Sequence, residues 1–547
     1  MASIVKAYDK KTGKYYAYRH EPKWDPVKKR DVGKRVCIGI YNPENGEITS
    51  SRNYKQRVAK DSAKSKESIK NNSSVRVRLD QPVKVRKVGG VHLLDQVTKE
   101  LGLDKALEKV FPHIGKDLLA LAYHAVISDR SDAYTFPEWN HEHMLNTERN
   151  LSSQTISEIY KLVSDVQIEQ FFKEIKQIFP DEEYYAYDTT SISSYSTNIS
   201  YVEKGVNKDH LPLKQINMLL IVGEKTGLPA YYRILDGNTP DNKTVRVVLA
   251  ELYELGYNCI FLVFDRGFYS YENVERLIRD EKKTIVGTRI NLNYIKKSLS
   301  LVRDKLELAE SFDEELDIRC VSIKVGLDKI KKLKTKPDDI QKAEDMEGVE
   351  NVTLHFFLDK PREIQENHKV IKSLKECLNE YKQGSDDEDV AEIVEKFFEK
   401  DVYDNYFIKN DEVDKLNEKN GVFVLLTNTD LSSREVLKIY RKKDVVEKVN
   451  EHYKDDVDCD RLRVKSDATL RGKMFVKFLA IIYVSQIEAK LRKYNETVEQ
   501  VNLSKRQIFA KLEKINKIRI GDKEIYSEIL SDQIKIFNIL GYQPPKI

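Results

Sequence analysis

The chain has 547 residues, of which 40% are apolar and 33% are charged, a balance typical of a globular protein with apolar cores and a strongly charged surface. No apolar run approaches the ~18 residues of a membrane span, and the first residues, MASIVKAYDK, lack the apolar core of a signal peptide. The net charge is only +4, and the five cysteines are scattered and never in CxxC spacing, which argues against a disulfide framework or a zinc site and favours the reducing cytoplasm.

The first segment, residues 1–90, is basic, with 23 Lys and Arg against 9 Asp and Glu. KYYAYRH and KRVCIGIY alternate as strands do, and NPENGEI is typical of a turn, so residues 1–50 are expected to form a small β meander. Residues 51–90 are polar and basic and are interpreted as a linker. The positive charge favours a polyanionic partner, nucleic acid first, over the alternative of a merely solvated lysine-rich surface.

Residues 91–180 change to a helical period, as in HLLDQVTKELGLDKALEKVF and DLLALAYHAVI. NLSSQTISEIYKLVSDVQIEQFFKEIKQIF predicts two further helices, with Ser152 or Ser153 as the N-cap of the first. Such a block is either a DNA-reading unit or an ordinary helical bundle, and its sequence leaves both interpretations open.

From residue 181 to residue 289 the pattern is α/β. EYYAYDTTSIS predicts a strand, KQINMLLIVGEKTGLPAYYRIL a hairpin, and CIFLVFDRGF and KTIVGTRI two more strands, each after a helix or followed by one. The order β-β-β-α-β-α-β fits a mixed sheet flanked by helices.

Residues 290–420 interrupt this order. In residues 291–420 Lys and Arg number 23 against 32 Asp and Glu, and KQGSDDEDVAE has the composition of a loop, so the segment is interpreted as an acidic insertion. GVFVLLTNTD then resumes with a strand, and one helix is predicted over 433–454. The sequence therefore predicts six segments. They are a basic β-rich region with its linker at 1–90, a helical domain at 91–180, the first part of the α/β core at 181–289, the insertion at 290–420, the second part of the core at 421–490 and a helical tail at 491–547.

Two carboxylates stand out in the α/β part. Asp188 lies within a predicted strand, and Asp265 ends a later one. Carboxylates at the same edge of an α/β sheet converge on one cleft, and oxygen ligands favour Mg²⁺ or Mn²⁺. The competing interpretations are that Asp188 caps a turn at the following Thr-Thr-Ser, and that Asp265 pairs with Arg266 or shapes the turn before Gly267.

A third acid is expected from the helix predicted at 433–454. On an ideal helix its Tyr440, Lys443, Glu447 and Lys454 fall within an arc of about 60°. A carboxylate flanked by cations suits a metal ligand with phosphate-binding neighbours, although a solvent-exposed stripe with i,i+4 ion pairs has the same spacing.

These residues resemble a known family. The four-residue stripe has the spacing of the Tyr-Arg-Glu-Lys signature of bacterial insertion-sequence transposases, with Lys443 in place of the Arg. YAYDTTSIS and FLVFDRGFYS resemble the first and second acid motifs, and RLRVKSDATLRGKMFVKFLAIIY resembles the block after the third acid. The chain is similar to DDE transposases of the insertion-sequence-4-like, 1634-type group over most of its length, least in 290–420 and in the first 90 residues.

The resemblance implies an RNase H-like core interrupted by an insertion. It implies that Asp188, Asp265 and Glu447 are the catalytic acids and hold two Mg²⁺ (or Mn²⁺) ions per active site. It further implies that Tyr440, Lys443 and Lys454 bind DNA. The partners would be the terminal inverted repeats and target DNA, cut and joined by a cytoplasmic, nucleoid-associated homodimer.

Three other functions share parts of this pattern. An RNase H-like nuclease would use the same acids without strand transfer, and a domesticated DNA-binding protein would not need all three. A sugar or nucleotide enzyme on a doubly wound sheet is disfavoured, because neither GxGxxG nor GxxxxGK[ST] occurs in the sequence.

Overall fold

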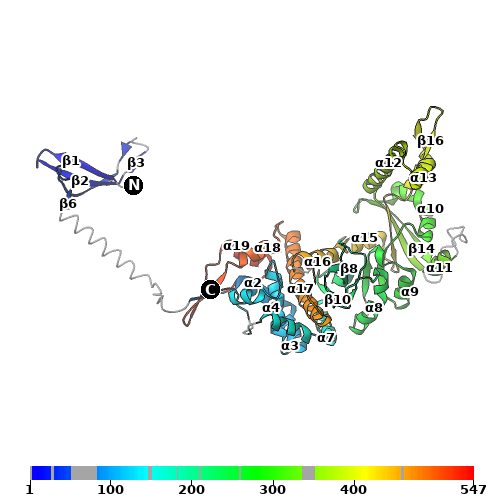
Figure 1. Cartoon of the computed structure of the whole chain (residues 1–547), viewed down its shortest axis with the longest axis horizontal. Coiled ribbons are helices and arrows are strands. Elements are labelled where there is room, and N and C mark those ends of the chain that lie inside the picture. Colours follow the sequence, from blue (N-terminus) through cyan, green and yellow to red (C-terminus); the bar gives the residue numbers. More distant parts are fainter. Residues whose placement is uncertain are drawn as a thin grey trace. The chain divides into compact units, whose positions relative to one another are not determined.

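The structure is a computed structural model of the chain (Figure 1). It describes residues 3–21, 23–25, 30–31, 33–50, 83–145, 149, 151–180, 183–208, 211–257, 260–335, 351–457 and 461–546. The chain divides into two compact units, Met1–Val83 and Lys84–Ile547. Most of the predicted linker, residues 51–82, lies outside the described residues.

The first unit is a four-stranded antiparallel sheet in the order β1-β2-β5-β6. The strands predicted from KYYAYRH and KRVCIGIY are confirmed, and the predicted turn connects the last two strands. The bounds are Ser3–Asp9 for β1, Lys14–Glu21 for β2, Lys34–Tyr41 for β5 and Ile48–Ser50 for β6, with a short ribbon of β3 (Trp24–Asp25) and β4 (Arg30–Asp31) between β2 and β5.

The second unit begins with helices packed around one long helix. The early helices are α2 (Gly89–Leu101), α3 (Leu103–Val110), α4 (Gly115–Ile127), α5 (Phe136–Glu142), α6 (Ser153–Leu162) and α7 (Asp165–Ile175), followed by the short η1 (Lys176–Ile178). Ser152 is the N-cap of α6, because its hydroxyl accepts from Thr155 N at 3.1 Å. Helix α17 (Asp467–Thr497) is buried along most of its length and packs on α4 and α6. The helical block therefore shares one apolar core with the rest of this unit.

The tail closes onto the start of the same unit. Helices α18 (Lys505–Leu512) and α19 (Ser531–Ile539) pack on α17, and the segment between them forms an antiparallel hairpin of β19 (Asn516–Ile520) and β20 (Lys523–Tyr526). Strand β7 (Val83–Lys87) adds a third strand to that hairpin.

A nine-stranded mixed sheet forms the centre of the second unit, in the order β10-β9-β8-β11-β12-β18-β15-β14-β13. Strands β8, β9 and β10 form an antiparallel meander, whereas β11 and β12 run parallel to β8. The bounds are Tyr184–Ser193 for β8, Gln215–Gly223 for β9, Pro229–Asp236 for β10, Phe261–Phe264 for β11, Lys283–Thr288 for β12 and Val422–Thr427 for β18. The predicted order of elements along the chain and the expected mixed α/β fold are confirmed.

Helices cover both faces of this sheet. Helices α8 (Asp241–Glu254) and α9 (Tyr271–Arg279) belong to the crossovers around β11, and η2 (Arg266–Phe268) follows β11 directly. Apolar side chains of one face join the main core around α17. The other face carries a second core beneath α15 (Ser433–Arg441).

The segment expected as an insertion has two parts. Its first part extends the sheet beyond β18 through β15 (Asn351–Leu358), β14 (Ile318–Gly326) and β13 (Phe312–Asp313), with α10 (Asn293–Glu307), η3 (Ala309–Ser311) and α11 (Leu327–Thr335) beside them. Its second part has a small core of its own, formed by α12 (Lys360–Lys382), α13 (Glu388–Phe397), β16 (Phe398–Lys400), β17 (Tyr406–Ile408) and α14 (Asn410–Asn417). The domain boundaries themselves stay a prediction.

One predicted element is wrong. The single helix expected over 433–454 is two helices, α15 and α16 (Asp444–Asp455). At the junction, Lys443 N bonds to Tyr440 O and Val446 N bonds to Lys443 O, each three residues back rather than four. The regular α-helical hydrogen bonding is therefore interrupted between Tyr440 and Glu447. Among the described residues, no helix is long and apolar enough to cross a membrane.

Candidate active site

The two sheet carboxylates lie at matching positions of neighbouring strands. Strands β8 and β11 are parallel, and Tyr187 pairs with Phe264. Asp188 and Asp265 are the next residues of their chains, so they stand side by side where β11 ends. The parallel pairing thus brings together two acids that are 77 residues apart in the sequence.

Two of the three alternative roles considered for these acids do not fit, whereas Asp265 does begin the turn through Gly267, because its backbone oxygen accepts from Phe268 N at 3.1 Å. Thr189, Thr190 and Ser191 belong to β8, so Asp188 is not the cap of a turn. The Asp265 side chain makes no capping hydrogen bond to η2, and no Asp265–Arg266 ion pair is found in the described part of the chain.

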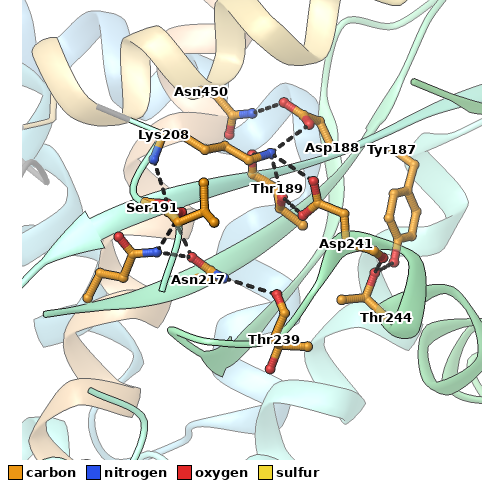
Figure 2. A network of polar contacts seen from close by, with 12 residues as sticks. Tyr187, Asp188, Thr189, Ser191, Lys208, Asn217, Thr239, Asp241, Thr244 and Asn450 are labelled. Atoms are coloured by element: carbon orange, nitrogen blue, oxygen red, sulfur yellow. Dashed lines mark hydrogen bonds and ion pairs between the residues drawn. The ribbon is translucent and has the colours of Figure 1, made fainter. Parts of the chain in front are cut away.

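Asp188 is held by donors from two other elements (Figure 2). Asn450 of α16 donates its Nδ2 to Asp188 Oδ2 at 3.0 Å. Lys208, in the loop between β8 and β9, places its Nζ 3.5 Å from Asp188 Oδ1 and also 3.5 Å from Asp241 Oδ2. The same Nζ donates to Thr189 O at 2.7 Å and to Thr189 Oγ1 at 2.6 Å. One ammonium group therefore bridges two carboxylates beside β8.

Burial determines the protonation behaviour of Asp188. Loss of hydration raises the pKa of its carboxyl group above the usual value, and the nearby Lys208 ammonium only partly opposes this. A buried carboxylate with incomplete compensation attracts further positive charge. Its oxygens are suited to a hard divalent cation.

Asp265 is held from α15. Tyr440 Oη donates to Asp265 Oδ1 at 3.0 Å. Burial and the negative charge of Asp265 raise the pKa of the Tyr440 phenol, so this group is a neutral hydrogen-bond donor at physiological pH.

Gly287 makes this approach possible. It lies on β12, and a Cβ atom there would be 2.8 Å from Tyr440 Oη and 3.1 Å from Arg266 N. Any side chain at this position would crowd the phenol that contacts Asp265. The glycine is therefore needed for close packing of α15 against the sheet edge.

Glu447 and Lys443 form an ion pair on α16. The Glu447 side chain is 52% exposed, whereas that of Lys443 is 8% exposed. Burial lowers the pKa of Lys443, but the bond to Glu447 and the charges of Asp265 and Asp188 outweigh it and raise the pKa above its usual value. The negative charges of all three predicted acids thus act on the Lys443 ammonium. Lys454 lies half-buried near the end of α16, two turns beyond Glu447.

The fit to a divalent metal is partial. Asp188 and Asp265 offer adjacent oxygen ligands, as a hard cation requires. In the described residues, however, no three His, Cys, Asp or Glu side chains come close enough to form a complete set of ligands. The Glu447 carboxylate is paired with Lys443.

The sequence interpretation missed three polar partners of the site, namely Lys208, Asp241 and Asn450. Asn450 could have been found, because it lies three residues after Glu447 and hence on the same face of a helix. Lys208 lies in a loop without periodicity, and only the fold brings it to Asp188.

Comparison with known proteins gives two findings. A family model described as "Transposase DDE domain" matches residues 180–483. Among solved structures, the chain is similar to a piggyBac transposase in a cryo-EM structure of its synaptic complex with hairpin DNA, at 10% identity and a TM-score of 0.34, covering 72% of this chain and 69% of that one. No curated protein matches the chain.

Proposed function

The chain belongs to the family of transposases with a DDE domain, and we propose that it binds the ends of a mobile element, cuts DNA there and joins the freed 3′-OH ends to target DNA. The observation that carries this proposal is the side-by-side placement of Asp188 and Asp265 on the parallel strands β8 and β11. Nucleic-acid hydrolysis at such a site needs acids that converge at one sheet edge.

The strand order supports an RNase H-like core. Three antiparallel strands, β10, β9 and β8, are followed in the sheet by β11 and β12, which run parallel to β8. The spacing of Tyr440, Lys443, Glu447 and Lys454 in the sequence supports membership of the insertion-sequence-4-like, 1634-type group, with Lys443 replacing the signature Arg. Lys keeps the positive charge but lacks the bidentate fork of Arg.

Asp188, Asp265 and Glu447 would hold two Mg²⁺ or Mn²⁺ ions. When bound, such ions supply charge stabilisation at the attacking and leaving oxygens of a phosphoryl transfer. The adjacent sheet acids support two of these assignments. The third is supported by the spacing of Glu447 from Tyr440 and Lys443, and by the Lys443 ammonium, on which the charges of Glu447, Asp265 and Asp188 all act.

The other residues of the site would orient the acids and the DNA. Asn450 fixes one oxygen of Asp188, and Tyr440 fixes one oxygen of Asp265. Lys443 and Lys454 would pair with phosphates next to the bond that is cut. In the first step a water oxygen attacks phosphorus, the bond to the 3′ oxygen breaks, and a 3′-OH and a 5′-phosphate are left. In the second step that 3′-OH attacks a phosphorus of target DNA and displaces another 3′ oxygen.

DNA binding and assembly would involve parts of the chain outside the candidate active site. The helical region at 91–180 would contact the terminal repeats, and two copies of the chain would hold two ends together. The basic N-terminal region supports a nucleic-acid partner by its charge.

The test is cleavage of duplex DNA that contains the sequences flanking the gene, in Mg²⁺. We expect wild-type protein to nick and join this DNA, and expect Asp188→Ala, Asp265→Ala and Glu447→Ala each to abolish both steps while DNA binding persists. Asp304→Ala, an exposed carboxylate on α10, is the matched control. Cleavage without joining would favour the nuclease alternative, and binding without cleavage would favour a domesticated DNA-binding protein. Full activity of any of the three acid variants would remove that residue from the site.

A further inference from the structure

A cleft of about 950 Å³ opens beside Asp265. Its walls are the turn after β11, the ends of β12 and β18, the last turn of α15 and the first turn of α12. Tyr440 and Lys443 also line it, so the cleft begins at the candidate active site and leads toward the segment 290–420.

Positive charge outweighs negative charge in this cleft. Five cationic side chains line it against three carboxylates, one of which is Asp265. A second carboxylate, Asp359, already accepts the N–H of Arg362 as the N-cap of α12. The cations are Arg266, Arg289, Arg362, Arg441 and Lys443.

Three of these cations have no carboxylate partner among the described residues. Arg266, Arg289 and Arg441 are exposed and make no ion pair there, whereas many other arginines in the same unit do. Arg362 differs, because its Nε is 2.8 Å from Glu366. Convergent, unpaired guanidinium groups repel each other, and the repulsion is relieved when a polyanion enters between them.

The three arginines come from three separate elements. Arg266 follows Asp265 in η2, Arg289 comes directly after β12, and Arg441 is the last residue of α15. Their planar forks are suited to bidentate contact with phosphate oxygens. Arg289 also lines a neighbouring cavity of about 820 Å³ that reaches Lys208 and Asp241, so this side chain borders both spaces.

From this arrangement we propose that the cleft is a DNA site, in which Arg266, Arg289 and Arg441 bind consecutive phosphates of the strand that leads away from the reacting phosphate. The inference rests on the proposed DNA-cleaving function and extends it to residues outside the four-residue signature. The strand passes Asp265 and runs toward β18 and α12. Arg362 contributes less, because Glu366 already neutralises it.

The salt dependence of DNA binding tests this assignment. Each phosphate contact releases bound cations, so removing one contact lowers the slope of log K against log salt by about 1. We expect Arg289→Gln and Arg441→Gln each to lower the slope by that amount, measured by fluorescence anisotropy with a labelled duplex of arbitrary sequence and without divalent metal. Arg289→Lys should keep the slope, because the charge is retained.

Two arginines serve as controls. Arg246→Gln on α8 removes an exposed charge outside the cleft and should leave the slope unchanged, and Arg362→Gln should change it less than Arg289→Gln. Slopes of Arg289→Gln and Arg441→Gln equal to that of Arg246→Gln would overturn the inference. This readout is separate from cleavage, so a wild-type protein that binds but never cuts DNA would refute the proposed function and leave the cleft assignment standing.

Discussion

Replacing Gly287 by alanine is the most direct test of the contact between α15 and the sheet acids. The added Cβ would lie 2.8 Å from Tyr440 Oη, whereas an ordinary contact needs at least 3.4 Å. The phenol must therefore move by about 0.6 Å, and its 3.0 Å hydrogen bond to Asp265 cannot keep its present geometry. Because a shift of ~1 Å among reacting groups can cost about 100-fold in rate, we expect DNA cleavage to fall about tenfold.

The double variant separates this mechanism from general damage. In Gly287→Ala/Tyr440→Phe the closest atom that the new methyl group meets is gone and only the 3.1 Å approach to Arg266 N remains, so the loss should be close to that of Tyr440→Phe alone. Single-turnover cleavage in Mg²⁺ gives the rates, and thermal unfolding of each variant checks that the fold is kept. Losses that simply multiply in the double variant, or a Gly287→Ala protein as active as wild type, would refute the argument.

Three further substitutions probe other contacts of the same helices and loop. Asn450→Leu should slow cleavage about tenfold and lower the unfolding free energy by about 1–3 kcal/mol, since the buried Asp188 Oδ2 loses a hydrogen-bond donor; unchanged stability in denaturant titration would contradict this. Lys208→Met should tighten Mn²⁺ binding by about fivefold in calorimetry, because the Lys208 ammonium, 3.5 Å from Asp188 Oδ1, competes with a bound cation for that carboxylate, and a contact of unit charges at this distance is worth about 1 kcal/mol even in a water-like medium; unchanged or weaker binding would count against a role in neutralising Asp188. The last is His452→Gln. Burial lowers the pKa of His452, but its 2.5 Å bond to Asp456 outweighs this and raises the pKa above 6.5. The extra stability is fully present below the pKa that His452 has in the unfolded chain, and it is lost as pH rises through the higher pKa that His452 has in the folded protein. The variant should therefore lower the melting temperature at about pH 6 and have less effect at about pH 9.

The sheet acids could be predicted because strands carry their information locally. Alternating residues indicated β8, and an apolar run indicated β11. When such strands pair in parallel, the residues at their ends lie together. The signal for the start of α15 is equally local in the sequence, since Ser432 and Glu435, three residues apart, form a capping box.

The remaining features depend on tertiary contacts. No Gly or Pro marks the junction at Lys442 and Lys443, so the sequence favours one uninterrupted helix. Packing overrides this preference, because α15 covers the second core while α16 lies against β8 and β9. Likewise, no local pattern shows that β15 pairs with β18 and so makes part of the acidic segment continuous with the sheet.

The break between α15 and α16 divides the support of the two sheet acids between two helices. Tyr440, before the break, contacts Asp265, and Asn450, after it, contacts Asp188. On one straight helix these two side chains would be about 15 Å apart along the axis, too far to reach adjacent strands that are about 5 Å apart. The turn at Lys443 shortens that span and buries the lysine where all three acids act on its charge. Lys443 therefore lies at the break between the two helices, between the residues that hold the two sheet acids.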